Sequence, residues 1–585
     1  MRKWASGAVC LVAAAMVVLA CGSENRQSFE NNIDPNKPGN GDLGTSGGLG
    51  EGSCSAAGTT CVGNDVHVCA DGGAGAFVKT CDSTGEFCFG GECAASCDAA
   101  EAWGSIVGCE FWAADLDNEY SDLNDAAGAP WGVVVSNFGK TAAHVTIEKN
   151  DAPPGTAPKI VKVIEETLAP DSLKELTLPT REVDGSTSKD NGSGTFLSSN
   201  AFRIKSDVPI VVYQFNTLRH TFSNDASLLI PKNGLGTVYR VLGWPTTNPI
   251  AFQIPGAPPI AGIPDHSFVT VIGTIEGTKV KVTVGGPTVA GSGHPAKKKG
   301  EVIEQMLGPF DVLNIESDGI PGDMTGTIVE STKPVVVFTG GERGIAPMAD
   351  GPPAPPGYDS KDLCCTDHLE EQLLPVTSYG KTFVLTRSPI RSKGGYVEPD
   401  ILRFMGVAAE TTIKTSLPAP FDNFTLQPGE HRDTWTTGDV VVEASEPLAV
   451  AQILVSQGFT TGSGSEGGDP SLTIFPPVDQ YRRDYLFNVP TSWGKNYVVI
   501  AAEVGKKVQI DGKEASGCTV SPAGVMAGKT WESRRCPVSE GTHRMTGDAP
   551  FGIIAYGYGS RGSYAFVGGA NVKKIYEPPP LPPIK

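Results

Sequence analysis

The 585-residue sequence lacks the patterns of a helical protein and of the common enzyme classes. No stretch keeps an amphipathic period of 3.6 residues over three turns, so we expect at most one short helix, at residues 361–374. The eight histidines form no HExxH zinc motif. Matches to GxGxxG at 39–44, to GxSxG at 44–48 and to SxxK at 186–189 lie in polar, loop-like stretches. The sequence therefore predicts a protein that is not an enzyme.

An excess of positive charge is also absent. Lys and Arg number 46 against 65 Asp and Glu, which gives a net charge of −19. This charge repels phosphate backbones, so we expect no nucleic-acid partner. The basic run at 297–299 follows a Gly-Ser-Gly sequence and indicates a solvated loop tip.

The apolar run at residues 7–19 is too short to span a bilayer, which needs about 20 apolar residues. It follows Arg2 and Lys3 and ends in small residues before Cys21, the order of a bacterial lipoprotein signal peptide. We predict cleavage before Cys21 and attachment of a lipid there, so the membrane is a partner through this anchor. An ordinary secretory signal with a chance cysteine is the alternative. Gly22, in place of an aspartate, favours an outer-membrane lipoprotein, exposed at the cell surface or facing the periplasm.

Residues 22–53 contain scarcely an apolar side chain, so we predict a flexible tether there. Cysteines crowd the next segment, residues 54–109, which is too small to bury a sufficient core without cross-links. Their spacing forms no paired CxxC knuckles, so disulfides are favoured over zinc. The disulfide candidates of the chain are Cys54, Cys61, Cys69, Cys81, Cys88, Cys93, Cys97, Cys109, Cys364, Cys365, Cys518 and Cys536.

Two later cysteine pairs stand apart from this segment. Cys518 and Cys536 predict a disulfide near the end of the chain. Cys364 and Cys365 are adjacent, so they form a vicinal disulfide or each bridge elsewhere. Asp367, His368 and Glu371 follow closely, which leaves a metal site or redox switch as the alternative to a structural cross-link.

Beyond Cys109 the chain reads as short strands of alternating or β-branched residues bounded by Gly, Pro and Asp. A proline between two apolar strands recurs at Pro209, Pro334, Pro447 and Pro550, roughly 110 residues apart. A second proline element recurs at 231, 375 and 490. We predict four modules, at 110–225, 226–345, 346–460 and 461–576, and a solvated proline-rich tail at 577–585.

Each module holds about seven strand candidates, which matches a two-sheet sandwich of roughly 100 residues. The predicted fold class is therefore all-β, with tandem antiparallel sandwich-like modules after a small disulfide-rich module. A β-propeller with two blades per repeat is the alternative.

Residues 108–118 (GCEFWAADLDN), 130–137 (PWGVVVSN) and 364–372 (CCTDHLEEQ) resemble the IgGFc-binding protein N-terminal domain family, as it occurs in lipoproteins of myxobacteria-like organisms. The resemblance covers about residues 98–572. It implies an extracellular protein-binding or adhesive module. The family is named for immunoglobulin Fc recognition by animal relatives, a ligand that a soil bacterium has no evident need to bind. No ligand-contact residue follows from the resemblance.

One acidic cluster suggests a cation. Asp115, Asp117, Asn118 and Asp122 lie close together and offer the hard oxygen ligands that suit calcium. Tyr120 stands where an EF-hand loop needs glycine, which excludes that loop type. Capping and turn formation by these side chains is the alternative explanation. We therefore expect no cofactor, with calcium at this cluster as the alternative.

Together these features predict a lipid-anchored envelope protein that binds a protein or glycan ligand outside the cell and has no catalytic activity. The alternative is a carbohydrate-binding protein that engages matrix polysaccharide. That alternative rests on the eight tryptophans, including Trp244 and Trp493, because aromatic platforms stack on sugars.

Overall fold

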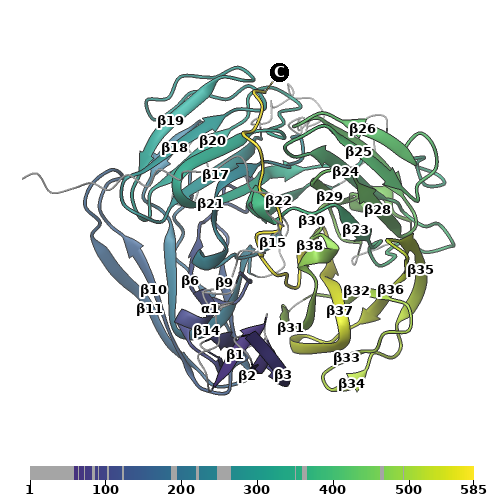
Figure 1. Ribbon diagram of the computed structural model, residues 1–585. Helices are drawn as coiled ribbons and strands as arrows, with labels where there is room; N and C mark the ends of the chain where they lie inside the picture. The colour runs from purple at the N-terminus through teal and green to yellow at the C-terminus, as the bar shows by residue number, and fades with distance from the viewer. Residues whose placement is uncertain are drawn as a thin grey trace, which may run out of the picture. The chain divides into compact units, whose positions relative to one another are not determined.

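The computed structural model describes most of the chain after the predicted tether (Figure 1). The described residues are 58–62, 65–70, 73–81, 86–89, 91–101, 104–121, 124–185, 194–218, 223–246, 265–348, 351–358, 365–461, 467–491 and 493–584. The chain divides into two units, 1–46 and 47–585, and all described residues belong to the second. The signal peptide, the tether, Cys21, Cys54, Asp122 and Cys364 lie outside them.

The described chain is almost entirely β, as the sequence predicts. Every ladder between its named strands is antiparallel, and its single α-helix is α1 (Cys97–Glu101). Among the described helices, none has the length and apolarity to cross a membrane. The helix expected at 361–374 is wrong for the described part, because β22 (Asp367–Gln372) is a strand paired with β21. All six of its side chains are buried, so no one-sided pattern marks it.

Disulfides hold the N-terminal region together. Its strands form a three-stranded sheet of β1 (Thr59–Val62), β2 (Asp65–Ala70) and β3 (Gly73–Thr80), and a hairpin of β4 (Phe87–Phe89) and β5 (Glu92–Ala94). Its core comprises Val66 and half-cystines. Cys61 pairs with Cys88 and Cys81 with Cys93. Because so little apolar surface is buried here, the cross-links supply the missing stability.

The first large sheet follows this region. A third disulfide, Cys97–Cys109, joins α1 to β6, a strand of this first large sheet. The sheet comprises β6 (Gly108–Ala113), β9 (Gly132–Asn137), β10 (Ala143–Asn150), β11 (Ile160–Leu168), β12 (Ser172–Thr177), β14 (Phe202–Asn216) and β15 (Asp225–Leu228). A small hairpin of β7 (Tyr120–Ser121) and β8 (Asn124–Asp125) precedes β9.

The second large sheet has eight strands. They are β13 (Phe196–Ser198), β16 (Gly236–Arg240), β17 (Ser267–Gly273), β18 (Thr278–Thr283), β19 (Val302–Leu307), β20 (Val312–Glu316), β21 (Ile328–Gly344) and β22. β13 comes from the predicted first module and β22 from the third, so sheets exchange strands near the predicted boundaries. The boundaries themselves stay a prediction.

Two four-stranded sheets follow and pack as a sandwich. One contains β23 (Thr382–Leu385), β28 (Val440–Ala444), β25 (Thr411–Thr415) and β26 (Asn423–Leu426). The other contains β27 (His431–Thr436), β24 (Asp400–Gly406), β29 (Leu448–Leu454) and β30 (Leu472–Ile474). Phe383 and Val442 of one sheet share a buried core with Phe404 and Val450 of the other.

The last large sheet again has eight strands. They are β31 (Arg482–Val489), β32 (Lys495–Glu503), β33 (Val508–Ile510), β34 (Lys513–Glu514), β35 (Thr519–Met526), β36 (Lys529–Pro537), β37 (Gly541–Gly559) and β38 (Gly562–Val567). The disulfide Cys518–Cys536 links the start of β35 to β36.

The recurring prolines mark where a long strand passes from one layer to another. β14 pairs with β10 before Pro209 and with β9 after it. β21 changes partner from β18 to β17 around Pro334, and β37 from β33 to β32 around Pro550. At Pro447 the strand breaks into β28 and β29, which lie in the two sheets of the sandwich. Proline has no N–H to donate, so it is tolerated where ladder pairing changes. The three long strands fold their sheets into half-barrels.

The second recurring proline element is a short 3-10 turn. Pro231, Pro375 and Pro477 each precede such a turn, with an extended backbone at the proline. The third copy is therefore Pro477 rather than the predicted Pro490, which directly follows β31. The sequence is misleading in this copy because Gly494-Lys495-Asn496-Tyr497, which follows Pro490, is similar to Gly236-Thr237-Val238-Tyr239, which follows Pro231.

Buried cores join neighbouring sheets along the chain and also join the first sheet to the last. Tyr213 of β14 shares a core with Phe487 of β31 and Phe566 of β38. Residues 104–106, just before β6, also pair with residues 570–572, because Ile106 N donates to Ala570 O and Val572 N donates to Gly104 O. The tail, expected to be solvated, packs its half-buried Leu581 against the core beneath the second and third predicted modules, because an apolar side chain gains by leaving water.

Candidate functional site

A buried group of ionisable side chains lies where the first and second large sheets meet. We call it the acidic cluster, and its members are Asp117, Glu182, Asp184, His266, Glu316 and Glu342. All six are buried. They form two sets of three whose ligand atoms lie within 4.8 Å of one another, namely His266, Glu316 and Glu342, and Asp117, Glu182 and Asp184.

Strand order explains the first set. β17 lies between β20 and β21 and runs antiparallel to both, so it begins where its neighbours end. His266 precedes β17, Glu316 is the last residue of β20, and Glu342 lies near the end of β21. The ladder continues beyond the strands, since Ser317 N donates to Ser267 O and Glu342 N to His266 O. The three side chains therefore meet at one edge of the sheet.

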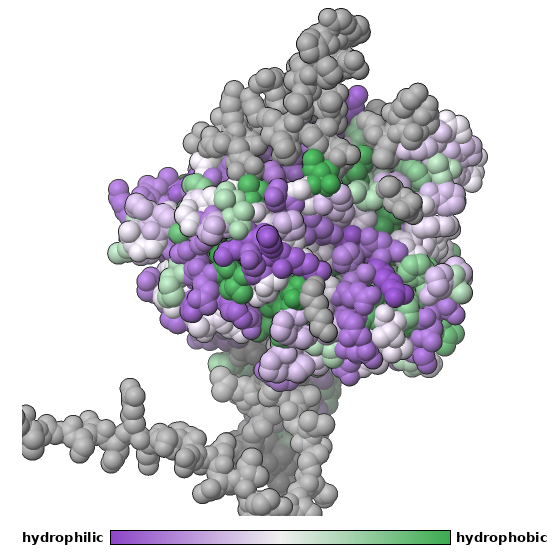
Figure 2. Space-filling view, turned by 90° about the horizontal axis from the view of Figure 1, so that it is seen from above, coloured by the Kyte–Doolittle hydropathy of each residue, from purple (hydrophilic) through white to green (hydrophobic). Residues whose placement is uncertain are grey.

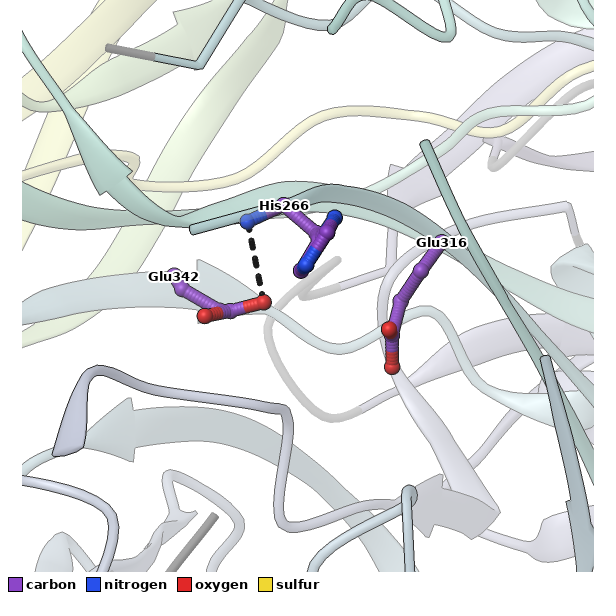
Figure 3. A group of neighbouring side chains, drawn as sticks. All are labelled: His266, Glu316 and Glu342. Atoms are coloured by element: carbon purple, nitrogen blue, oxygen red, sulfur yellow. Dashed lines mark hydrogen bonds between the residues drawn. The ribbon is translucent and has the colours of Figure 1, made fainter. Parts of the chain in front are cut away.

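Hydrogen bonds orient the first set. His266 Nδ1 lies 2.6 Å from Ser317 O, and the backbone N of His266 donates to a Glu342 carboxylate oxygen at 3.0 Å. Glu316 accepts hydrogen bonds from the Asn314 side-chain amide at 3.2 Å and from the backbone N of Gly194. The imidazole lies between the two carboxyl groups (Figure 3).

The second set assembles around a short parallel bridge between Asp115 and Glu182. Val183 N donates to Asp115 O, and the Asp115 carboxylate accepts Arg181 N at 2.7 Å. Asp117 Oδ1 is buried without a hydrogen-bond partner. Burial raises the pKa of Asp117 well above its usual range, and the charges of Glu342, Glu316, Asp184 and Glu182 raise it further. The two sets therefore share one electrostatic environment.

The sequence-predicted calcium ligands separate in the structure. Asp117 lies in the acidic cluster, whereas the Asp115 carboxylate accepts the backbone N–H of Arg181. The Asn118 side-chain amide donates to Asn216 and to Ser223 O. Asp122 lies outside the described residues. The other members of the cluster escaped sequence reasoning because they come from distant segments, although the pair Glu182 and Asp184 in the loop after β12 is a visible acidic signal.

A second group of buried carboxylates lies on the short strands β15 and β22 and just before β30. Asp225 accepts hydrogen bonds from Ser471 Oγ at 2.6 Å, Leu472 N at 3.1 Å and Glu370 N at 3.2 Å. It thereby cross-links three strands. Burial raises the pKa of Glu370 to about 8 and that of Asp469 to about 6. This group braces the structure through backbone contacts.

The residues around the adjacent cysteines take structural positions. Cys365 is disulfide-bonded, and its backbone N donates to Asp469 at 3.2 Å. Asp367 accepts hydrogen bonds from Asn224 N and from Ser563 N. His368 is fully buried, which lowers its pKa to about 3 and keeps the ring neutral. These contacts give Asp367 and His368 structural surroundings, and the role of Cys364 and Cys365 as a structural cross-link stays a prediction.

Both tryptophans that suggested a sugar platform are buried. The Trp244 ring lies 4.7 Å from the guanidinium carbon of Arg403, and its indole N–H donates to Ile345 O. Trp493 packs edge-on against Tyr564, with ring centroids 5.0 Å apart. Neither ring can stack on a ligand in solution.

Comparison with known proteins identifies one family. The model of the family described as IgGFc binding protein matches residues 225–557, more than half of the chain. The match begins at β15 and ends within β37, so it is narrower than the expected 98–572. No curated protein and no solved structure matches the chain. The match nevertheless agrees with the motifs at 364–372, and on its extent the chain belongs to the IgGFc binding protein family.

Proposed function

We propose that the protein is a lipid-anchored, extracellular protein-binding module of a bacterial envelope and that it acts without catalysis. The family match carries this proposal, because the family is one of extracellular binding proteins. The disulfides between described cysteines support it, since such bonds form and persist in oxidising compartments. The lipoprotein-type sequence before Cys21 supports the anchor.

The architecture suits a rigid module that presents its surface. The pairing of residues 104–106 with 570–572 and the shared cores hold the sheets together, so loops and edge strands remain for contact. Polar and apolar side chains are interspersed on the uncovered part of the face in Figure 2. Trp435 on the edge strand β27 is 41% exposed, and tryptophan is enriched in protein interfaces.

The binding test uses the oxidised full-length protein, held in lipid nanodiscs and exposed separately to immunoglobulin Fc, mucin and matrix polysaccharide. Saturable binding to a protein ligand, lost after reduction and heating, would support the proposal. Binding to the polysaccharide alone would replace it with the carbohydrate alternative. If none of the three ligands binds, the proposal of a general adhesive surface loses its support.

The anchor has its own test. Cys21→Ser should abolish lipid modification and release the protein from membranes, whereas Cys10→Ser, in the apolar part of the signal, should leave both unchanged. Mass spectrometry of the mature N-terminus and membrane fractionation provide the readouts. An unmodified Cys21 in the wild-type protein would contradict the anchor.

A further inference from the structure

We propose that His266, Glu316 and Glu342 bind one divalent transition-metal ion of the zinc or manganese kind. The site lies at the edge formed by β17, β20 and β21, and it is independent of the proposed binding function. Three observations carry it: the hydrogen bonding of the imidazole, the spacing of the three ligand atoms, and the charge around them.

The imidazole presents a lone pair to the acidic cluster. Ser317 O can only accept a hydrogen bond, so His266 Nδ1, 2.6 Å away, must carry the hydrogen. In the neutral ring Nε2 is then an acceptor, and it is buried without a hydrogen-bond partner. An Nδ1–H bonded to a backbone carbonyl is the arrangement that orients histidine ligands of metals. The ring lies between the Glu316 and Glu342 carboxyl groups (Figure 3).

The spacing suits a single ion. One atom from each residue lies within 4.8 Å of the other two. Atoms that bind one zinc ion at about 2.0–2.2 Å lie at most about 4.4 Å apart, so the side chains need little adjustment. Both carboxylates are already oriented, Glu342 by the backbone N of His266 and Glu316 by the Asn314 amide.

The surrounding charge favours a cation. Asp117 lies close enough for the charges of Glu316 and Glu342 to raise its pKa, and its Oδ1 has no hydrogen-bond partner. The neighbouring Arg343 forms ion pairs with Glu119, at 3.3 Å, and with Asp265. Burying several carboxylates is costly unless protons or a cation neutralise them.

The ligand types choose the ion. Calcium and magnesium take oxygen ligands, so an imidazole nitrogen disfavours both. Imidazole together with carboxylates suits zinc and manganese. The all-oxygen set of Asp117, Glu182 and Asp184 is the one that suits calcium, and it provides the contrast for the test.

The experiment strips the oxidised full-length protein with a chelator and titrates it calorimetrically with Zn²⁺, Mn²⁺ and Ca²⁺. The variants are His266→Gln and Glu342→Gln. His368→Gln is the matched control, because His368 is equally buried, lies outside the acidic cluster and has no hydrogen-bond partner on either ring nitrogen. Circular dichroism and thermal unfolding confirm that each variant is folded, and visible absorption of bound Co²⁺ reports nitrogen and oxygen ligation.

We expect one Zn²⁺ or Mn²⁺ per wild-type chain, binding at least about 10-fold weaker in His266→Gln and Glu342→Gln, and unchanged binding in His368→Gln. Failure of the stripped wild type to bind either ion overturns the proposal. Equal affinity of His266→Gln and the wild type overturns it as well. Uptake of Ca²⁺ alone also overturns it and assigns the cluster to the Asp117 set.

Discussion

The hydroxyl of Tyr213 in β14 donates a hydrogen bond to the carbonyl oxygen of Leu486 in β31, 3.1 Å away, across 273 residues of sequence. The same hydroxyl lies 3.2 Å from Gly568 O, and the ring packs against Phe566. One buried side chain thus joins the first large sheet to the last. A substitution at Tyr213 therefore measures how much this contact between the two sheets contributes to stability.

Tyr213→Phe should destabilise the protein by about 1–3 kcal/mol, because it leaves buried carbonyl oxygens without a donor while keeping the ring. Chemical denaturation measures the change. Tyr396→Phe is the control, since that hydroxyl makes an exposed contact of 3.4 Å with Pro353 O, and it should cost less than about 0.5 kcal/mol. Equal costs for the two variants would show that the Tyr213 contact adds nothing.

Glu370 should make stability depend on pH. Its carboxyl is buried, so its folded pKa is about 8, against 4.5 for the free side chain. The folded state therefore holds the proton more tightly, and this stabilisation is present in full below about pH 4.5 and is lost as pH rises through 8. The Glu370→Gln side chain cannot ionise. The free energy of unfolding of this variant, relative to that of the wild type, should therefore increase from pH 5 to pH 8 by on the order of 3 kcal/mol.

Urea denaturation at pH 5, 6, 7 and 8 tests this dependence. Glu330→Gln, at a half-exposed position on β21 paired with Lys281, should follow the wild type at every pH. Other buried carboxyls beside Glu370, such as Asp225 and Glu371, have raised pKa values, to which the charge of Glu370 contributes, so the difference reports the ionisation of Glu370 together with its effect on these neighbours. A difference that does not vary with pH would contradict the raised pKa.

Arg403 of β24 should be costly to truncate. Its guanidinium binds Asp433 at 2.7 Å and Asp323 at 2.8 Å and stacks on Trp244, so it joins the second and third predicted modules. Arg403→Ala leaves the partly buried Asp323 without its partner, which should cost about 2–3 kcal/mol in a thermal unfolding series. Arg403→Lys keeps the charge but loses the bidentate and stacked geometry, so its stability should lie between those of the wild type and Arg403→Ala.

Arg432→Ala on the neighbouring strand β27 is the matched control. Arg432 is half-exposed, forms a long ion pair of 3.9 Å with Glu430, and has its guanidinium carbon 5.7 Å from the centre of the Phe424 ring. We expect its loss to cost less than about 1 kcal/mol. Similar costs at the two arginines would mean that burial of Arg403 adds no stability.

The disulfide Cys97–Cys109 should protect the junction between α1 and β6. It closes a loop with a sequence separation of 12, for which loop entropy predicts about 3 kcal/mol. Replacing both cysteines by serine should speed amide hydrogen exchange in β6. The matched double variant at Cys518 and Cys536 should affect β35 and β36 and leave β6 protected. Unchanged exchange in β6 for the first variant would contradict the role.

Part of the fold is visible in local sequence. Alternating and β-branched runs predict the strands correctly, and Pro209, Pro334, Pro447 and Pro550 mark equivalent layer changes because proline cannot donate to a ladder. The residues of β22 are wrongly predicted as helical, because all its side chains are buried and the strand shows no alternation of polar and apolar residues. Pro490 misleads because a nearby sequence imitates the repeat.

The candidate site is less visible. Asp117 stands out in an acidic run, but its neighbours Glu182, Glu316 and Glu342 come from segments far along the chain. Their meeting depends on strand order and register, which place the ends of β17, β20 and β21 at one edge. The local sequence around His266 contains no motif that predicts a metal ligand.

By itself the sequence determined the all-β class, the repeat, the cysteine-rich start and the family resemblance, because each depends on residues close together in the chain. Only the tertiary structure decided which carboxylates share a buried site, that Trp244 and Trp493 are core residues, and that Tyr213 meets Leu486. These outcomes depend on long-range strand pairing. The free energy of such pairing is summed over whole sheets and leaves no mark on any single segment.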